Sequence, residues 1–130
     1  GNITYEPKKT FSIVNTHFPL DRKFRMQTSE FIRDLDIKTT FQLIVGDMNT
    51  FYDDGGQEMI DIMCSGGYVE LLPTENTFKS FPHDRIQTSS RLDHMICKGD
   101  YTYISSKVYN NTDYQIRPSD HFMCEVEIGF

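Results

Sequence analysis

The chain has 130 residues, enough for one domain with a hydrophobic core and too few for two domains of ordinary size. Its 38% hydrophobic and 25% charged residues are typical of a globular protein, and no apolar run of about eighteen residues predicts a membrane span. The formal net charge of −6 argues against a strongly basic nucleic-acid-binding surface but is compatible with a carboxylate cluster that holds a divalent cation.

The first predicted strand begins at Phe11, where the sequence alternates and is rich in strand-forming residues. A turn at residues 16–19 ends it, which places His17 at a strand end. Residues 23–37 then predict a helix that packs against a sheet through one apolar stripe. The stripe consists of Phe24, Phe31, Ile32 and Leu35.

A second strand is predicted from Phe41 to Val45, a nearly continuous apolar run that is typical of a strand buried on both faces. The segment 46–49, Gly-Asp-Met-Asn, closes this run. Asp47 and Asn49 are therefore expected to emerge together from the carboxyl end of a strand.

The rest of the chain predicts one helix followed mainly by strands. Apolar residues repeat at helical spacing between residues 59 and 64, where the methionines are core residues and not a cofactor site, and two glycines at 66 and 67 stop the helix. The polar stretch 73–90 is expected to form a long surface loop. Three late strands are predicted at residues 92–97, 101–109 and 123–128. This order indicates an α/β (α+β) layered unit with one mixed sheet and helices on one of its faces.

Three widely spaced cysteines show no zinc-binding pattern and predict reduced, buried thiols. They are Cys64, Cys97 and Cys124. Reduced thiols favour an intracellular location, but a secreted protein whose signal peptide had been removed would look the same.

Four short segments place polar groups that suit phosphate chemistry at predicted strand ends. Each segment alone more often marks a turn or a hydrogen-bonded residue than an active site. Together they predict one cleft, because strands of one sheet that end on the same side bring such groups together. The segments are Asn15-Thr16-His17, Gly46-Asp47-Met48-Asn49, Arg91-Leu92-Asp93-His94 and Ser119-Asp120-His121.

The acidic groups of these segments suit a hard divalent cation. Mg²⁺ takes oxygen ligands and keeps several waters, so Asp47 and Asp120 are candidate ligands. Nearby imidazoles can donate to phosphate oxygens or transfer protons near neutral pH. Residues 119–121 do not by themselves form a nucleophilic triad, since neighbours in an extended chain point apart.

In this order and at these separations, the four segments resemble the motifs of the endonuclease/exonuclease/phosphatase family of DNase I-like, metal-dependent phosphoesterases. The family motifs are usually written Asn-Thr-His, Gly-Asp-Phe/Leu-Asn, Arg-Leu/Ile-Asp-Tyr and Ser-Asp-His. The chain departs from them at Met48 and His94, where Phe or Leu and Tyr are usual, and neither residue is expected to touch the metal. The resemblance covers the carboxy-terminal half of the family domain. Residues 1–130 are therefore expected to be a single unit that supplies roughly half of a DNase I-like layered sandwich.

The resemblance implies a role for each matching residue in an in-line attack of water on phosphorus. His121 matches the base or phosphate-activating histidine, and Asp93 matches the aspartate that fixes its tautomer. Asp47 matches the residue that positions the water or protonates the leaving group, and Asn49 matches the one that holds it and the phosphate. His17 matches a histidine that donates to the scissile phosphate. The implied metal ligands, for Mg²⁺ or alternatively Mn²⁺, are Asp47, Asn49 and Asp120.

The first half of the family domain normally brings a metal-binding glutamate, and nothing before the first predicted strand matches it. Glu6 is flanked by Tyr5 and Pro7, unlike that motif. Without the glutamate, metal affinity and turnover are expected to fall. The sheet face that meets the first half is expected to expose apolar surface, which isolated soluble chains rarely tolerate. We therefore expect a second chain, or a missing amino-terminal half, to cover it.

These observations predict divalent-metal-dependent hydrolysis of phosphate esters, incomplete in this chain because the glutamate is absent. A phosphodiesterase or nuclease is preferred over a phosphomonoesterase on the breadth of the family, although the acidic charge weighs against nucleic acid. The alternative is a non-catalytic half-domain that binds phosphate or a partner. A third interpretation is a generic α/β domain with coincidental motifs.

Other polar residues have simpler interpretations. His83 is predicted to be a solvated loop residue and His94 a strand residue. Arg91 and Arg117 either orient phosphate or pair with carboxylates. The tyrosines of the late strands either stack on bases or, more commonly, pack. They are Tyr101, Tyr103, Tyr109 and Tyr114.

Overall fold

The computed structural model describes residues 9–110 and 117–130, so Glu6 and Tyr114 lie outside the described residues. The strands are β1 (Phe11–His17), β2 (Phe41–Asp47), β3 (Val69–Glu70), β4 (Phe78–Lys79), β5 (Ser89–Ser90), β6 (Asp93–Gly99), β7 (Thr102–Tyr109) and β8 (Met123–Gly129). The helices are α1 (Arg22–Arg33), the short 3-10 helix η1 (Tyr52–Asp54) and α2 (Gly56–Ser65). Within the described ranges, no helix has the length and hydropathy that a membrane crossing requires.

Four strands form a mixed sheet in the order β1-β2-β6-β3. β1 and β2 are parallel, because α1 carries the chain back between them, and β6 is antiparallel to its neighbours β2 and β3. Phe41 is the register partner of both Phe11 and Gly99. The three long strands are therefore aligned from end to end, and residues at corresponding positions lie side by side.

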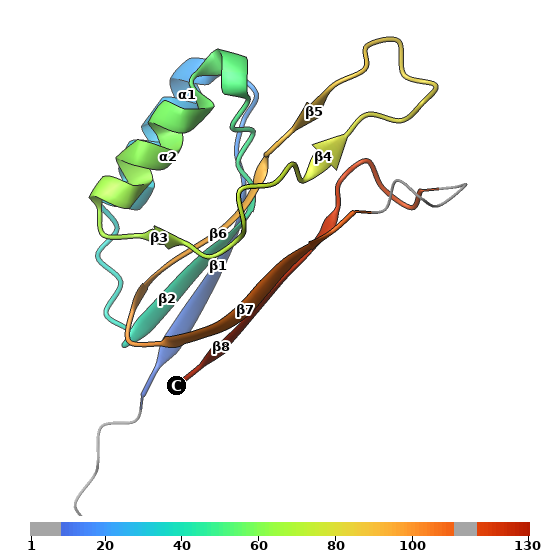
Figure 1. Ribbon diagram of the computed structural model, residues 1–130. Coiled ribbons are helices and arrows are strands. Elements are labelled where there is room, and N and C mark those ends of the chain that lie inside the picture. Colours follow the sequence, from blue (N-terminus) through green and yellow to red (C-terminus); the bar gives the residue numbers. More distant parts are fainter. Residues whose placement is uncertain (1–8, 111–116) are drawn as a thin grey trace, which may run out of the picture.

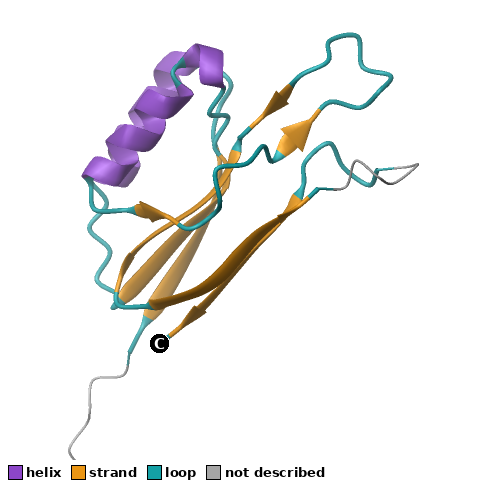
Figure 2. Ribbon diagram, viewed as in Figure 1, coloured by secondary structure: helices purple, strands orange, loops and turns teal. Residues whose placement is uncertain are grey.

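The two helices cover one face of this sheet (Figure 1; Figure 2). Alternate residues of β2 and β6 point toward the helices, and Ile44 and Ile96 are buried there. They form one hydrophobic core with Ile32 of α1 and Met63 of α2. Met59 is also fully buried, which confirms that the methionines of α2 are core residues.

β7 and β8 form a separate antiparallel ribbon that lies over the opposite face of the sheet (Figure 1). Val126 and Ile128 of the ribbon pack against buried Phe41 and Cys97 of the sheet. Tyr101 joins this core, with its ring centroid 5.5 Å from that of Phe41. The predicted layered α/β class with helices on one face is thus confirmed, although the last two strands form their own ladder instead of extending the mixed sheet.

The face of α1 that packs on the sheet differs from the prediction. Ile32 is buried and Leu35 packs at the edge of the core, as expected. Phe24 and Phe31 are instead 54% and 66% exposed, while Arg25 is completely buried. The predicted stripe was wrong at these positions because Arg25 finds acceptors in the Asn49 carbonyl and the Asp54 carboxylate, which make its burial tolerable and which helical periodicity cannot reveal.

The segment 73–90 is more ordered than the predicted surface loop. It contains β4 and β5, which pair as an antiparallel hairpin with Phe78 opposite Ser90. The hairpin projects beyond the sheet, next to the segment that leads into β8 (Figure 1). Its base therefore lies at the end of the sheet where the predicted functional residues gather.

Candidate active site

Three residues of the predicted site stand in one row across the sheet. The register pairs His17 of β1 with Asp47 of β2, and Asp47 with Asp93 of β6. Register partners project from the same face of a sheet, here the face opposite the helices. Because β1 and β2 end at this row and β6 begins there, the three side chains share one end of the sheet.

The end of β2 and the turn after it depend on two backbone conformations. Gly46 has a φ of 146°, and a Cβ there would lie 1.7 Å from the backbone oxygen of Thr16, so only glycine fits. Asn49 has a left-handed φ of 47°, which asparagine adopts more readily than most residues. Its backbone N–H donates to Oδ1 of Asp47 at 2.9 Å, and its side-chain Nδ2 donates to the carbonyl of Phe18 at 2.6 Å. The turn thereby holds the Asp47 carboxylate in place.

His121 reaches this row from the segment that precedes β8. Phe78 of β4 and His121 are bridge partners, and the next residue, Phe122, donates its N–H to the carbonyl of Thr77 at 2.7 Å. The Phe78 ring lies edge-on to the imidazole, with the ring centroids 5.2 Å apart. The β4–β5 hairpin therefore supports His121 against the end of the sheet.

Asp93 fixes the orientation of His121. Nδ1 of His121 donates to Oδ2 of Asp93 at 2.8 Å, which turns Nε2 toward Asp47, whose Oδ2 is 3.6 Å away. The same oxygen of Asp47 lies 3.5 Å from Nε2 of His17. Burial is the largest influence on His121 and lowers its pKa, but the hydrogen bond and charge of Asp93, with Asp47 and Asp120, raise the pKa above its ordinary value. The imidazole is suited to holding a proton near neutral pH.

Asp47, Asp93 and His121 each offer one ligand atom within 4.8 Å of the others. Among residues 9–110 and 117–130, this is the one group of three acidic, histidine or cysteine side chains with such spacing. The two carboxylates of this group offer the oxygen ligands that Mg²⁺ or Mn²⁺ prefers. Of the other predicted ligands, Asn49 uses its amide nitrogen on a backbone carbonyl and Asp120 is not a member of the group.

Arg25 supports the site from the helix layer, and no sequence motif indicated it. Its side chain is fully buried; one guanidinium nitrogen donates to the backbone oxygen of Asn49 and the other pairs with Asp54. The guanidinium also lies over the ring of Phe51, 5.6 Å from its centroid. Arg25 thus fixes the turn that carries Asp47 and Asn49.

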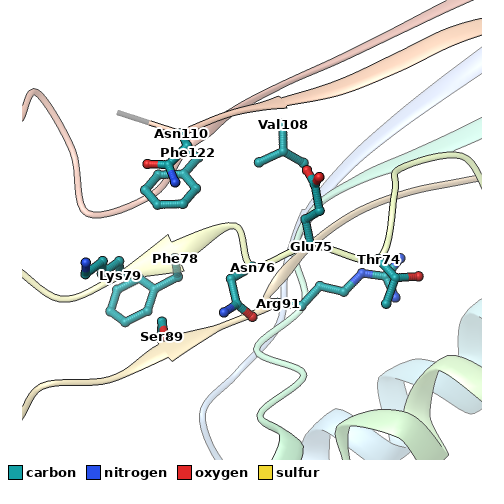
Figure 3. Close-up of a pocket in the computed structure, with 10 residues that line it drawn as sticks. All are labelled: Thr74, Glu75, Asn76, Phe78, Lys79, Ser89, Arg91, Val108, Asn110 and Phe122. Atoms are coloured by element: carbon teal, nitrogen blue, oxygen red, sulfur yellow. The ribbon is translucent and has the colours of Figure 1, made fainter. Parts of the chain in front are cut away.

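Phe122, next to His121, lines at least three cavities, two of which are large. One, of about 670 Å³, lies between the β4–β5 hairpin and the end of β7 (Figure 3). The other, of about 570 Å³, is lined by His121 itself. Both volumes are typical of small-molecule pockets. Figure 3 shows one end of the first cavity lined by Phe78, Phe122 and Asn110 and the other by Arg91 and Thr74.

No protein-family model and no curated protein matches the sequence. Solved structures do match. The mannosyl-6-phosphatase of Bacteroides thetaiotaomicron VPI-5482 superposes with a TM-score of 0.70 and 22% identity, over 91% of this chain and 51% of that chain. An endonuclease/exonuclease/phosphatase family protein from the same species superposes with a TM-score of 0.63 and 20% identity, over 91% of this chain and 49% of that chain. A protein of the same description from Leptotrichia buccalis C-1013-b superposes with a TM-score of 0.55 and 25% identity, over 80% of this chain and 41% of that chain.

The chain has the endonuclease/exonuclease/phosphatase fold. The resemblance drawn from its four motifs is confirmed at this level, since the matching structures share the arrangement of sheet and helices. The chain spans only about half the length of the proteins that it matches. It therefore represents part of the domain that those structures contain.

One surface of the chain is open and apolar. Phe11 and Ile13 of the end strand β1 are each 62% exposed. Phe11 stacks on Phe130, which is itself 61% exposed, with ring centroids 5.7 Å apart. This agrees with the expectation that the half-domain exposes apolar sheet surface.

The two departures from the endonuclease/exonuclease/phosphatase motifs lie away from the acidic row. Met48 is fully buried in the core beneath the helices. His94 is a buried strand residue, as predicted, with Nε2 2.6 Å from Oγ1 of Thr50 and Nδ1 3.3 Å from Oε1 of Glu70. Arg91 donates to the same Glu70 oxygen at 3.2 Å, so it adopts the simpler of its two predicted roles.

The remaining polar residues are also explained by packing or by solvent. His83 is a loop residue with an 80% exposed side chain, which confirms the prediction of a solvated histidine. Arg117 donates to the backbone carbonyls of Lys79 and Ser80 at 2.9 and 2.6 Å, a role that neither predicted alternative included. It therefore braces the β4–β5 hairpin near His121.

Proposed function

We propose that the chain is one half of a divalent-metal-dependent phosphoesterase that cleaves phosphate esters by attack of water on phosphorus. The observation that carries this proposal is His121, held by Asp93 at 2.8 Å and directed at Asp47. A histidine with a fixed tautomer next to a second carboxylate is the arrangement that general acid–base chemistry requires. The three residues come from separate segments, so local chain geometry does not account for their proximity.

His121 binds the phosphate in this proposal. With Nδ1 occupied by Asp93, Nε2 carries a proton toward a phosphoryl oxygen. The raised pKa of His121 favours that proton near neutral pH. The resulting positive charge stabilises the negative charge that develops on the oxygen during attack.

Asp47 orients the attacking water. Its Oδ1 accepts the N–H of Asn49, so Oδ2 is the atom directed toward the open end of the sheet, between His17 and His121. A carboxylate in this position accepts a hydrogen bond from water and aligns it with phosphorus. His17, whose side chain is 76% exposed, donates to the phosphate from the end of β1.

Mg²⁺, or alternatively Mn²⁺, is the proposed cofactor. Asp47 belongs both to the predicted ligand set and to the spatial group of three, so it is the first candidate ligand, followed by Asn49, Asp93 and Asp120. When bound, the ion supplies Lewis-acid stabilisation of the phosphoryl oxygens. A glutamate from the other half of the domain would complete its coordination.

The first substrate class is the phosphodiester. The cavity of about 570 Å³ that His121 lines has room for the group esterified to phosphorus. The net charge of −6 weighs against long nucleic acids, whose binding depends on many cationic contacts. Phosphomonoesters are the second class, because one matching structure is named as a phosphatase.

The open apolar surface is where we propose that the rest of the domain packs. Phe11, Ile13 and Phe130 together present large exposed apolar side chains beside β1, which is an end strand of the sheet within the described part of the chain. The matching structures are about twice the length of this chain. The partner is therefore the other half of the fold, either in the same polypeptide or as a second chain.

Release of p-nitrophenol from bis(p-nitrophenyl) phosphate and from p-nitrophenyl phosphate tests the function, with and without Mg²⁺ or Mn²⁺. Because the glutamate of the other half is absent, we expect slow metal-dependent release, which His121→Ala abolishes. His83→Ala is the matched control, because it removes an exposed loop histidine and should keep the activity. Release that is unaffected by His121→Ala would exclude the proposed site.

A non-catalytic half-domain that binds phosphate or a partner is the second candidate. The observation in its favour is that the chain spans about half of each matching structure. It predicts no turnover with either ester, yet saturable binding of inorganic phosphate that His121→Ala weakens. Turnover by the wild-type chain would exclude it.

A further inference from the structure

Thr77 is a fully buried residue that touches both chain segments of the site. Its Oγ1 accepts the backbone N–H of Leu92 at 3.0 Å and that of Asp93 at 2.9 Å. Its backbone carbonyl accepts the N–H of Phe122 at 2.7 Å. One residue is therefore bonded to the start of β6, where Asp93 lies, and to the residue next to His121.

The hydroxyl of Thr77 is not needed to build the hairpin. The backbone N–H of Thr77 donates to the carbonyl of Ser90 at 3.0 Å, so the main chain makes the hairpin connection. Valine would occupy the same volume and has a high preference for strands. What valine lacks is an acceptor for the two N–H groups of Leu92 and Asp93, and buried N–H groups without an acceptor are costly.

We propose that Thr77 is a positioning residue for the Asp93–His121 pair of the proposed phosphoesterase site. Through Oγ1 it sets the place of the Asp93 backbone, and through its carbonyl it sets the place of the chain beside His121. The bond between those two side chains is 2.8 Å long, and N–H···O bonds weaken beyond about 3.2 Å. A shift of a few tenths of an ångström in either segment therefore disrupts the pair.

The test compares three variants by two readouts that need no substrate. Thr77→Val removes the oxygen at constant volume, and Thr77→Ser keeps it. Ser80→Ala is the matched control: Ser80 is buried in the same hairpin, but its Oγ accepts the N–H of Thr88 at 2.8 Å and makes no bond to either site segment. The readouts are the downfield proton resonance of the hydrogen-bonded Nδ1–H of His121 and the midpoint of thermal unfolding.

We expect Thr77→Val to lose or broaden the His121 Nδ1–H resonance, and Thr77→Ser to restore it at the wild-type position. Ser80→Ala should lower the unfolding midpoint and keep the resonance. The proposal fails if Thr77→Val retains the resonance unchanged, or if Ser80→Ala loses it to the same extent. Should Thr77→Val not fold, Thr77→Cys replaces it, because a thiol is only a weak acceptor and should shift the resonance partway.

These results are separable from those for the proposed function, on which the inference rests. A chain that turns over no ester but loses the resonance in Thr77→Val refutes the enzyme and keeps the positioning role. A chain that turns over ester, but whose Thr77→Val variant keeps the His121 resonance unchanged, keeps the enzyme and refutes the positioning role. Each half is thus decided by its own measurement.

Discussion

Oδ2 of Asp93 and Nδ1 of His121 lie 2.8 Å apart, although the two residues are 28 positions apart in the sequence. Asp93 begins β6 in the four-stranded sheet, while His121 precedes β8 of the ribbon. Their hydrogen bond therefore links the sheet to the ribbon layer at the end of the sheet that carries the candidate site. A change that moves one layer relative to the other should lengthen this bond.

Replacing Asp93 with Asn should lower the pKa of His121, because the hydrogen bond to a charged acceptor is lost. In the wild-type chain the raised pKa stabilises the folded state fully below about pH 6.5, the value of a free histidine. This contribution is lost as the pH rises through the raised pKa. Histidine proton titration by NMR measures the shift, and urea unfolding at several pH values measures the linkage. An unchanged pKa of His121 in Asp93→Asn would contradict the role of Asp93. The signal of His83 serves as the internal control.

Mg²⁺ should stabilise the chain if the acidic row binds it. A ligand at ten times its dissociation constant adds about 1.4 kcal/mol to the free energy of unfolding, which raises the thermal midpoint. Asp47→Asn should abolish this gain, whereas Asp36→Asn, at an exposed carboxylate paired with Lys38, should not. No shift of the midpoint even at millimolar Mg²⁺ would rule out an intact metal site in this chain.

Replacing Arg25 with Met should lower the free energy of unfolding by about 2 kcal/mol, since it removes a buried hydrogen bond from a charged group to the Asn49 carbonyl together with the ion pair to Asp54. Arg33→Met on the same helix is the control, because Arg33 pairs with the exposed Asp34 at the surface and its loss should hardly change the free energy of unfolding. Urea denaturation of both variants makes the comparison. An equal loss of unfolding free energy in both variants would mean that the contact of Arg25 with the Asn49 turn does not stabilise the fold more than a surface ion pair does.

Cys124 should resist alkylation in the folded chain. Burial, followed by the nearby charges of Asp93 and Glu70, raises the pKa of its thiol to about 11. At pH 8 roughly 0.1% of such a thiol is ionised, compared with about a quarter of a free thiol, and the thiolate is the reactive form. Mass spectrometry after timed iodoacetamide treatment should show that Cys124 is alkylated about two orders of magnitude more slowly in the native chain than in denaturant. Modification of native Cys124 at the unfolded rate would contradict this.

The strands that carry the site could be predicted closely. The first ends at His17 as expected, and the second reaches Asp47, two residues beyond the apolar run that predicted it. The long strands of the sheet could be recognised because each packs one face against the helices, which favours alternating or continuous apolar character. The helix face could not be predicted in the same way. Arg25 looks like a surface residue until the carbonyl of Asn49 is known to lie beneath it.

The convergence of the motif residues could also be predicted, because strands aligned at one end bring their terminal groups together. The supporting residues could not. Thr77 and Arg25 act on backbone groups of distant segments, and a backbone group carries no sequence signal of its availability. The candidate ligand group also differs from the prediction: it includes Asp93, which was expected only to pair with His121, and it does not include Asp120. Which carboxylate faces the site depends on tertiary placement, which the sequence does not show.

The alignment of His17, Asp47 and Asp93 across three strands has a consequence for folding. Sliding β2 by one residue against its neighbours would bring Gly46 or Met48 into the place of Asp47 and turn the carboxylate toward the helices. A misregistered sheet could still bury much of its apolar surface, yet it would have no acidic row. Phosphate or metal binding at the proposed site would therefore report correct strand register, and such a signal would serve as a selective assay for correctly folded molecules in a mixed population.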